Sequence, residues 1–240
     1  MLPCQPLIDK DPLLYIDVTE ALRRGIGEVL YADEAACLIG FPHPDAPTTE
    51  FTTLCGDLDA AKRVFAMLPW SENILFAVHE DFCLPYLKET YHVKPFLGES
   101  FYQVAYFAKE PLSIPESPFS VAPLTPAYLE QVAAIHKDEE ASYLLDRLKA
   151  GVMMGAFDGD TLTGFIGVHG EGSMGLLQVR PDYRRRGIGK LLEAHLINRL
   201  LAQGQIPYGS VLTDNEASLA LQRSLGLTIS TNTFHWLCKD

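Results

Sequence analysis

One stretch decides the fold of this chain: residues 175–189 read GLLQVRPDYRRRGIG. The apolar run at its start predicts a β-strand, and Pro181, which cannot donate a backbone hydrogen bond, ends that strand. Beyond the glycines, apolar residues recur every three or four positions, namely at Ile188, Leu191, Leu192, Leu196 and Leu200. This spacing predicts an amphipathic helix. The stretch is therefore a strand, a turn and the start of a helix.

The turn combines glycine with positive charge. The first backbone N–H groups of a helix have no partner within the helix and carry partial positive charge, so this junction can receive an anion. Gly187 and Gly189 let an anion approach the backbone closely. Cationic side chains that suit phosphate oxygens surround them, namely Arg184, Arg185, Arg186 and Lys190. Like charges at the positive pole of a helix repel one another, which favours anion binding over a merely solvated helix end.

The composition narrows the classes of partner. The 19 Lys and Arg residues face 31 Asp and Glu residues, so the formal charge of -12 disfavours nucleic acid and anionic membranes as partners. No apolar run has membrane-spanning length, and the N-terminus lacks the pattern of a secretory signal. The 5 cysteines are scattered without a Cys-x-x-Cys unit, which predicts free thiols and no metal. We expect a soluble cytoplasmic protein.

A proline-rich segment divides the chain. Between Lys109 and Pro126 five prolines lie among Ser, Glu and short apolar residues, as in an extended connector. We place a domain boundary near Pro115, with an N-terminal α/β domain over residues 1–115 and a second domain over residues 116–240. An ordinary long loop within one domain is the alternative.

The second half predicts a definite order of elements. A strand at Ser120–Ala122 precedes two helices, and a hairpin over Val152–Val168 leads into the strand of the opening stretch. After its helix come another strand, another helix and a last strand over Leu227–Leu237. The order is β-α-α-β-β-β-α-β-α-β, and the fold class is α/β (α+β).

This order, with Arg184-x-x-Gly187-x-Gly189 at the fourth strand-to-helix junction, resembles the GNAT superfamily of acyl-CoA-dependent N-acyltransferases. The later runs 211–218 and 225–227 are similar to the next strand, helix and strand of that family. Residues near Pro181 and Asn215 look most like the glycine N-acyltransferase branch. The resemblance covers about residues 118–240 and implies a GNAT fold with a central mixed sheet. That branch carries a degenerate second copy of the fold at its N-terminus, so the first domain here is expected to be such a copy.

The resemblance implies roles for particular residues. The CoA pyrophosphate would lie on the backbone amides of the turn, from Arg185 through Arg186, Gly187, Ile188 and Gly189 to Lys190. The pantetheine arm would run along the strand as an added strand does, bonded to Leu177, Gln178 and Val179. A strand amide would stabilise the developing negative charge of the thioester carbonyl, and Asn215 would hydrogen-bond near the sulfur.

The sequence departs from the family pattern at two catalytic positions. Many GNAT enzymes have a Glu base where this chain has Ser173, and a Tyr acid where it has Gln222. Neither Ser nor Gln titrates near neutral pH. Nearby residues that could replace the missing acid and base are His169, Glu171 and Tyr208. Two alternatives are a water molecule relayed through Ser173 and a substrate amine that needs no strong base. We take Glu171, Ser173 and Asn215 as the candidate catalytic residues.

Two other signals are set aside. Residues 23–27 read RRGIG, as do residues 185–189, but they follow a predicted helix and precede a strand, so we interpret them as a helix C-terminus. His79-Glu80-Asp81 with Cys83 does not have the His-Glu-x-x-His spacing of a metal site.

The sequence therefore predicts an N-acyltransferase that uses acetyl-CoA or another acyl-CoA and transfers the acyl group directly to a small amine or amino acid. The alternative is an acyl-CoA-binding module without catalysis, which Ser173 and Gln222 keep open.

Overall fold

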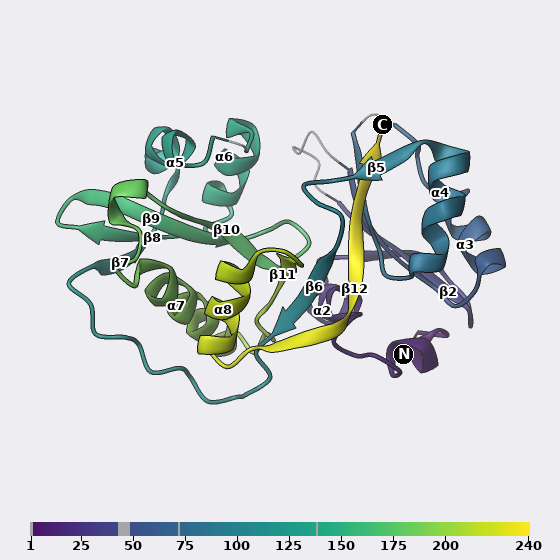
Figure 1. The fold of residues 1–240 in the computed structure, drawn as a ribbon, viewed down its shortest axis with the longest axis horizontal. Helices are drawn as coiled ribbons and strands as arrows, with labels where there is room; N and C mark the ends of the chain where they lie inside the picture. Colours follow the sequence, from purple (N-terminus) through teal and green to yellow (C-terminus); the bar gives the residue numbers. More distant parts are fainter. Residues whose placement is uncertain (1, 43–48, 72, 138) are drawn as a thin grey trace. The chain divides into compact units, whose positions relative to one another are not determined.

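The chain forms two compact units in the computed structural model, which describes residues 2–42, 49–71, 73–137 and 139–240 (Figure 1). The first unit comprises residues 1–105, 210–216 and 229–240, and the second comprises residues 106–209 and 217–228. This division differs from the predicted domains 1–115 and 116–240. The N-terminal part of the first unit ends at Ala105, and two later segments of the chain also belong to this unit. Strand pairing can join residues that lie far apart in sequence.

The first unit has a mixed sheet with helices on both faces. Its strands lie in the order β1-β2-β3-β4-β12-β6, with β5 also paired to β12. β3 and β4 are parallel, whereas β12 is antiparallel to β4. The strands are β1 (Glu28–Ala32), β2 (Ala36–Phe41), β3 (Thr49–Cys55), β4 (Ile74–Val78), β5 (Val93–Pro95), β6 (Phe101–Ala105) and β12 (Thr228–Lys239). The helices are α1 (Gln5–Ile8), α2 (Ile16–Arg24), α3 (Leu58–Phe65), the 3-10 turn η1 (Asp81–Cys83) and α4 (Leu84–Tyr91).

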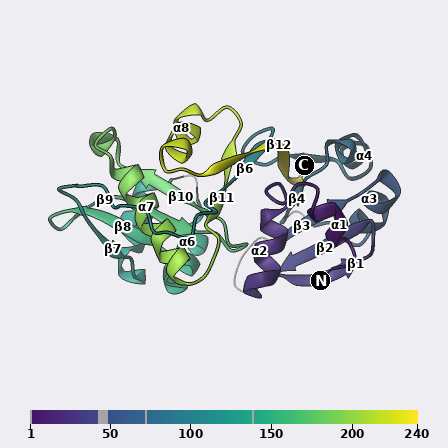
Figure 2. The same ribbon diagram turned by 90° about the horizontal axis from the view of Figure 1, so that it is seen from below.

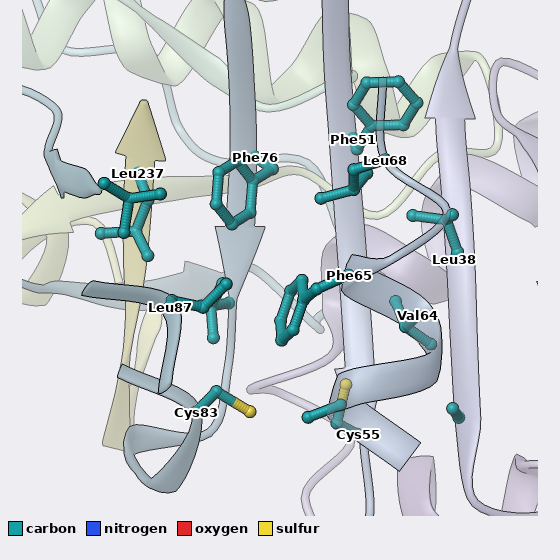
Figure 3. Close-up of a cluster of buried hydrophobic side chains, with 14 of the residues drawn as sticks. Leu38, Phe51, Cys55, Val64, Phe65, Leu68, Phe76, Cys83, Leu87 and Leu237 are labelled. Carbon is teal, nitrogen blue, oxygen red and sulfur yellow. The ribbon is translucent and has the colours of Figure 1, made fainter. Parts of the chain in front are cut away.

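Two apolar clusters cover the two faces of this sheet. Leu38 of β2 joins Phe65 of α3, Phe76 of β4 and Leu87 of α4 in one cluster (Figure 3). The next residue along β2, Ile39, joins α2 residues in the other cluster. Successive side chains of a strand point to opposite faces, so β2 is buried throughout because both faces are covered.

The elements of the second unit follow the predicted order as far as the helix that comes after its last strand. The final predicted strand pairs within the first unit instead. Its sheet order is β11-β10-β9-β8-β7, antiparallel except for the parallel pair β10 and β11. The strands are β7 (Ser120–Pro123), β8 (Met154–Asp158), β9 (Thr161–Val168), β10 (Met174–Val179) and β11 (Tyr208–Leu212). The helices are α5 (Leu129–Ile135), α6 (Ala141–Lys149), α7 (Ile188–Ala202) and α8 (Glu216–Ser224), with 3-10 turns η2 (Pro126–Tyr128) and η3 (Pro181–Tyr183).

Helices cover both faces of this second sheet. α5 and α6 lie on one face of β8–β10 and α7 lies on the other, crossing in front of these strands in the turned view (Figure 2). Leu144 and Leu148 of α6 pack with Phe165 of β9 and Leu176 of β10. The other face is filled by buried residues of α7, such as Leu192. The loops at the ends of β9 and β10 therefore stand on a layered unit.

All five cysteines are free thiols, as the sequence predicts. Among the described helices, none combines the length and the apolar character needed to cross a lipid bilayer.

Candidate active site

Strand β10 is interrupted in its middle by a bulge. Gly175 lies opposite Gly167 of β9 and Gln178 lies opposite Phe165, so β10 carries one extra residue between these pairs. Leu176 has a φ of 56°, a left-handed conformation that is uncommon for a leucine. On its other side β10 is registered with β11 through Met174 and Gly209. Within the described chain, Gln178 and Val179 thus have a strand partner on one side only, and Leu177 lies in the bulge.

The turn after β10 places two left-handed residues before α7. Arg185 has a φ of 62° and Gly187 a φ of 81°. Gly187 is the N-cap of α7 and provides no side-chain cap, and the Leu191 N–H donates to its carbonyl at 3.0 Å. The N–H groups of Ile188, Gly189 and Lys190 come earlier in the helix than this first bond, so no helix carbonyl four residues before them accepts from them. Fifteen-residue α7 adds its dipole to this end, which makes the turn a candidate anion site.

The glycines leave this anion site open. A Cβ atom at Gly187 would meet no atom within 4 Å, and one at Gly189 would meet only the Leu177 and Leu221 side chains, both at 3.8 Å. Packing within the protein therefore does not require glycine at position 189. Glycine at this position leaves the backbone accessible to a ligand.

The cationic side chains of the turn do not all face the anion site. The Arg184 Nε donates to the Val179 carbonyl at 3.1 Å, and the Lys190 Nζ donates to the Ser224 carbonyl at 3.2 Å. The Arg186 guanidinium lies 4.9 Å from the centre of the Tyr183 ring. Arg185 has no hydrogen bond or ion pair among the residues that the structure describes, and it is exposed. Arg185 is thus the cation of this turn that is most available to a phosphate.

The turn from β9 into β10 brings together two of the candidate catalytic side chains, Glu171 and Ser173, and the Tyr208 hydroxyl reaches it. Glu171 and Ser173 are buried, with exposed fractions of 6% and 4%. The Ser173 hydroxyl donates to Glu171 Oε1, and the Tyr208 hydroxyl donates to the Glu171 carbonyl at 2.8 Å. Ser173 therefore binds a carboxylate and is not itself a base. Glu171, two residues from the position of the family base, is the group here that can accept a proton.

His169 lies in the same turn and has a partner that the sequence did not reveal. The Tyr143 hydroxyl is 2.8 Å from His169 Nδ1. Tyr143 belongs to α6, 26 positions earlier in the chain, and only the docking of α6 on the sheet brings it here. Sequence reasoning missed Tyr143 because no local pattern marks it.

Gln222, at the position of the family acid, contacts a buried carboxyl group of α7. Glu193 is 3% exposed, and burial raises its pKa to about 7, partly offset by a hydrogen bond with Gln222. The sequence gives no signal for Glu193 beyond its place on an otherwise apolar helix. This pair links α7 to α8, as does the bond from Lys190 to Ser224.

Asn215 belongs to the first unit, unlike the other candidate residues. It is exposed, it directly precedes α8, and its N–H donates to the Leu212 carbonyl at 3.0 Å. Its role toward the CoA sulfur stays a prediction.

Outside this site, the structure gathers Cys55, Glu80 and Cys83 in the first unit, with ligand atoms within 4.8 Å of one another. The spacing of Glu80 and Cys83 in the sequence did not predict a metal site, and no sequence pattern predicts that Cys55 of β3 lies near them. Glu80 accepts the Tyr15 hydroxyl at 2.9 Å, and burial raises its pKa to about 7. Both cysteines pack in the apolar core (Figure 3).

Residues 153–236 match the family model described as FR47-like protein. Over 80 residues the chain is 39% identical to the N-alpha-acetyltransferase RimI of Mycobacterium tuberculosis, covering 30% of this chain and 49% of the relative. Over 56 residues it is 39% identical to the [ribosomal protein bS18]-alanine N-acetyltransferase of Salmonella typhimurium, covering 23% and 38% of the two chains. The chain thus spans about half or less of the length of these relatives.

The fold is also found in solved structures. The GCN5-related N-acetyltransferase from Kribbella flavida is similar over 95% of each chain, with a TM-score of 0.64 and 13% sequence identity. This similarity concerns the fold and includes both units. Together with the FR47-like match over the strand, turn and helix of the anion site, it confirms the predicted mixed-sheet GNAT fold. The glycine N-acyltransferase branch stays a prediction. The chain therefore has the GNAT fold, and its residues 153–236 are similar to the FR47-like family.

Proposed function

We propose that this protein is an N-acetyltransferase that uses acetyl-CoA as its acyl donor. The N-terminus of α7 carries the proposal, because the open amides of Ile188, Gly189 and Lys190 follow a left-handed Gly187. Such a turn binds the oxygen atoms of a pyrophosphate through several N–H groups at once. Arg185 adds a full positive charge without giving up another contact.

The bulged strand supports the same ligand. Pantetheine is a chain of amides, and it can pair with a strand edge as a peptide does. Leu177, Gln178 and Val179 of β10 directly precede the anion site in sequence. One ligand can therefore place its pyrophosphate at α7 and its thioester near the bulge.

Direct transfer is the chemistry that the turn residues support. The amine nitrogen attacks the thioester carbonyl carbon, the new C–N bond forms, and the C–S bond then breaks. The attacking amine loses one proton, and the departing thiolate gains one. Glu171 is the proposed proton acceptor, and the Ser173 hydroxyl holds its carboxylate in place.

The acceptor is an amine, and two classes are proposed. The sequence predicts a small amine or a free amino acid. The Mycobacterium tuberculosis relative is instead named an N-alpha-acetyltransferase, and the Salmonella relative is named for acetylation of an alanine of ribosomal protein bS18. A peptide with a free N-terminal α-amine is therefore the second candidate.

Thiol release from acetyl-CoA tests the function. The acceptor panel contains polyamines, amino acids and short peptides, each also supplied with a blocked amine as its control. We expect thiol release with at least one free amine and with none of the blocked ones. Tight binding of CoA without turnover on any acceptor would instead identify a non-catalytic acyl-CoA-binding module.

Glu171→Gln tests the base. We expect kcat to fall by about 10²- to 10⁴-fold, the usual contribution of a general base, while CoA affinity is unchanged. Ser173→Ala is the matched variant, and it should lower kcat less because it removes a hydrogen bond and leaves the carboxylate. Wild-type kcat in Glu171→Gln would exclude Glu171 as the base.

A further inference from the structure

His169 has an unusually constrained imidazole. Its backbone closes the β9–β10 turn: its N–H donates to the Ser173 carbonyl at 2.8 Å, and its carbonyl accepts the Gly172 N–H at 3.1 Å. The ring lies over Gly175, where an added Cβ would be 2.2 Å from His169 Nε2 and 2.4 Å from Cδ2. Any other residue at position 175 would displace the ring. Gly175 therefore leaves room for Nε2 at the start of the bulged segment of β10.

The other ring nitrogen determines where the imidazole carries its proton. Tyr143 Oη lies 2.8 Å from Nδ1 and also accepts the Gly170 N–H at 3.4 Å. The phenol can donate its proton to Nδ1 while its oxygen still accepts from Gly170. A neutral imidazole that accepts at Nδ1 has its proton on Nε2. The stacked Tyr143 and His169 rings, with centres 6.0 Å apart, keep this arrangement in place.

We propose that His169 is a catalytic hydrogen-bond donor, and that its Nε2–H binds the thioester carbonyl oxygen as this oxygen becomes negative. Tyr143 is the positioning residue that fixes the tautomer. The inference rests on the proposed acetyl transfer. When the amine attacks, the carbonyl π electrons move to oxygen, and the Nε2–H stabilises that charge without leaving His169. The charge returns to the carbonyl as the C–S bond breaks, so His169 ends the reaction with its proton unchanged.

This role differs from that of a base in a measurable way. A base needs a lone pair on Nε2, which the Nε2–H tautomer does not have. Protonation of His169 adds a proton at Nδ1 and keeps the one at Nε2, so acid does not remove the donor. Tyr143 contacts the His169 ring directly, Arg147 lies 5.8 Å from the centre of the Tyr143 ring and is paired with Asp146, and Glu171 follows His169 by two residues in the same turn.

Nitrogen-15 NMR of the imidazole tests the tautomer without any activity measurement. In the wild type at a pH where His169 is neutral, we expect the proton on Nε2 and a lone pair on Nδ1. Tyr143→Phe should shift the population toward the other tautomer. A wild-type ring with its proton on Nδ1 would overturn the proposal.

Three variants then test the donor in catalysis. His169→Gln keeps an N–H donor near the place of Nε2, whereas His169→Asn places its amide near Nδ1 and His169→Ala has no donor. We expect kcat to fall by about 10²- to 10³-fold in the Asn and Ala variants, as for the loss of an oxyanion donor, and by less than about tenfold in the Gln variant. Equal losses in all three would contradict the donor role.

Tyr143→Phe adds a non-additivity test. It should lower kcat in the wild type and have little further effect in His169→Gln, because an amide has no tautomer to fix. The acid side of the pH profile of kcat should be the same in the wild type and in His169→Gln. Isothermal titration with CoA separates the two proposals. A wild type that binds CoA but acetylates no amine contradicts the proposed function. A wild type that acetylates amines, together with a His169→Gln variant whose pH profile of kcat no longer falls on the acid side, contradicts the donor role of His169.

Discussion

The pentapeptide RRGIG occurs at residues 23–27 and again at residues 185–189, with opposite structural roles. In the first unit it ends α2: Gly25, with a φ of 66°, is the C-cap, and Arg23 Nε lies 2.6 Å from Glu20 Oε1. In the second unit it begins α7, and Gly187, with a φ of 81°, is the N-cap. The same five residues thus lie at the negative pole of one helix and at the positive pole of another.

The space around the two segments also differs. A Cβ at Gly27 would lie 2.7 Å from the Ile39 side chain, whereas a Cβ at Gly189 would have no neighbour closer than 3.8 Å. In the first unit the glycine serves packing, and in the second it leaves room. Glycine and arginine therefore do not by themselves predict an anion site; the proposed site also depends on helix polarity and open space.

Buried charge in the first unit should have the largest effect on stability. Asp17 and His79 form a buried pair, with His79 Nε2 3.1 Å from Asp17 Oδ1 and Nδ1 2.7 Å from the Thr53 carbonyl. Both ring nitrogens face acceptors, so the ring is an imidazolium. Breaking such a pair costs about 3–5 kcal/mol, which we expect for Asp17→Asn in denaturant unfolding. The exposed pair Arg180–Asp182 is the control, and Asp182→Asn should cost less than about 1 kcal/mol.

The same pair predicts a pH dependence. Burial opposes the charge, but the Asp17 carboxylate outweighs it and raises the pKa of His79 to about 9. A raised folded-state pKa means that the stabilisation is complete below the unfolded value of about 6.5 and is lost as pH rises through about 9. Unfolding of the wild type between pH 6 and 10 should show this loss, and Asp17→Asn should not. Equal pH slopes in both proteins would contradict the ion pair.

Bulky residues at the two capping glycines should separate stability from binding. Gly187→Val and Gly25→Val both place a β-branched residue at positive φ, which costs about 1–2 kcal/mol of stability. Gly187→Val should also weaken CoA binding by about 10- to 100-fold, the loss of one or two hydrogen bonds to a charged group. Calorimetric titration of folded protein with CoA measures this. Similar CoA affinities in the two variants would show that the α7 turn is not the anion site.

At the second glycine of each pentapeptide, substitution should affect stability in the first unit and CoA affinity in the second. Gly27→Ala places a methyl group against Ile39 and should cost about 1–3 kcal/mol of stability without changing CoA affinity. Gly189→Ala should leave the melting temperature near that of the wild type and reduce CoA affinity. Loss of stability in Gly189→Ala, with CoA affinity intact, would mean that glycine serves packing there too.

The smallest effect concerns a single charge. Arg185→Ala should weaken CoA binding by several-fold and reduce its salt dependence, because one exposed cation contributes about 1 kcal/mol or less. Arg23→Ala, in the first pentapeptide, should leave both quantities unchanged.

Local signals predicted much of this molecule. Pro181 and the apolar spacing after Gly187 predicted the strand, turn and helix of the anion site, and the order of elements in the second unit follows the sequence. The first RRGIG was also correctly predicted to be a helix C-terminus. These features depend on residues within one or two helical turns of each other.

Features that depend on distant residues were not predicted. Nothing local shows that β12 inserts between β4 and β6 of the first unit, or that Tyr143 meets His169. The bulge at Leu176 is hidden as well, because leucine does not favour positive φ and tertiary packing must impose it. The candidate anion site was thus visible in the sequence, whereas the proposed reacting groups required the fold.

Amide hydrogen exchange with and without acetyl-CoA tests the central claim most directly, because it reports both pentapeptides in one experiment. We predict slower exchange at Ile188, Gly189 and Lys190 and along Leu177–Val179 when acetyl-CoA is bound, with no change at residues 25–27. Unchanged exchange at the start of α7 under saturating acetyl-CoA, or protection that appears at residues 25–27 instead, would contradict the account.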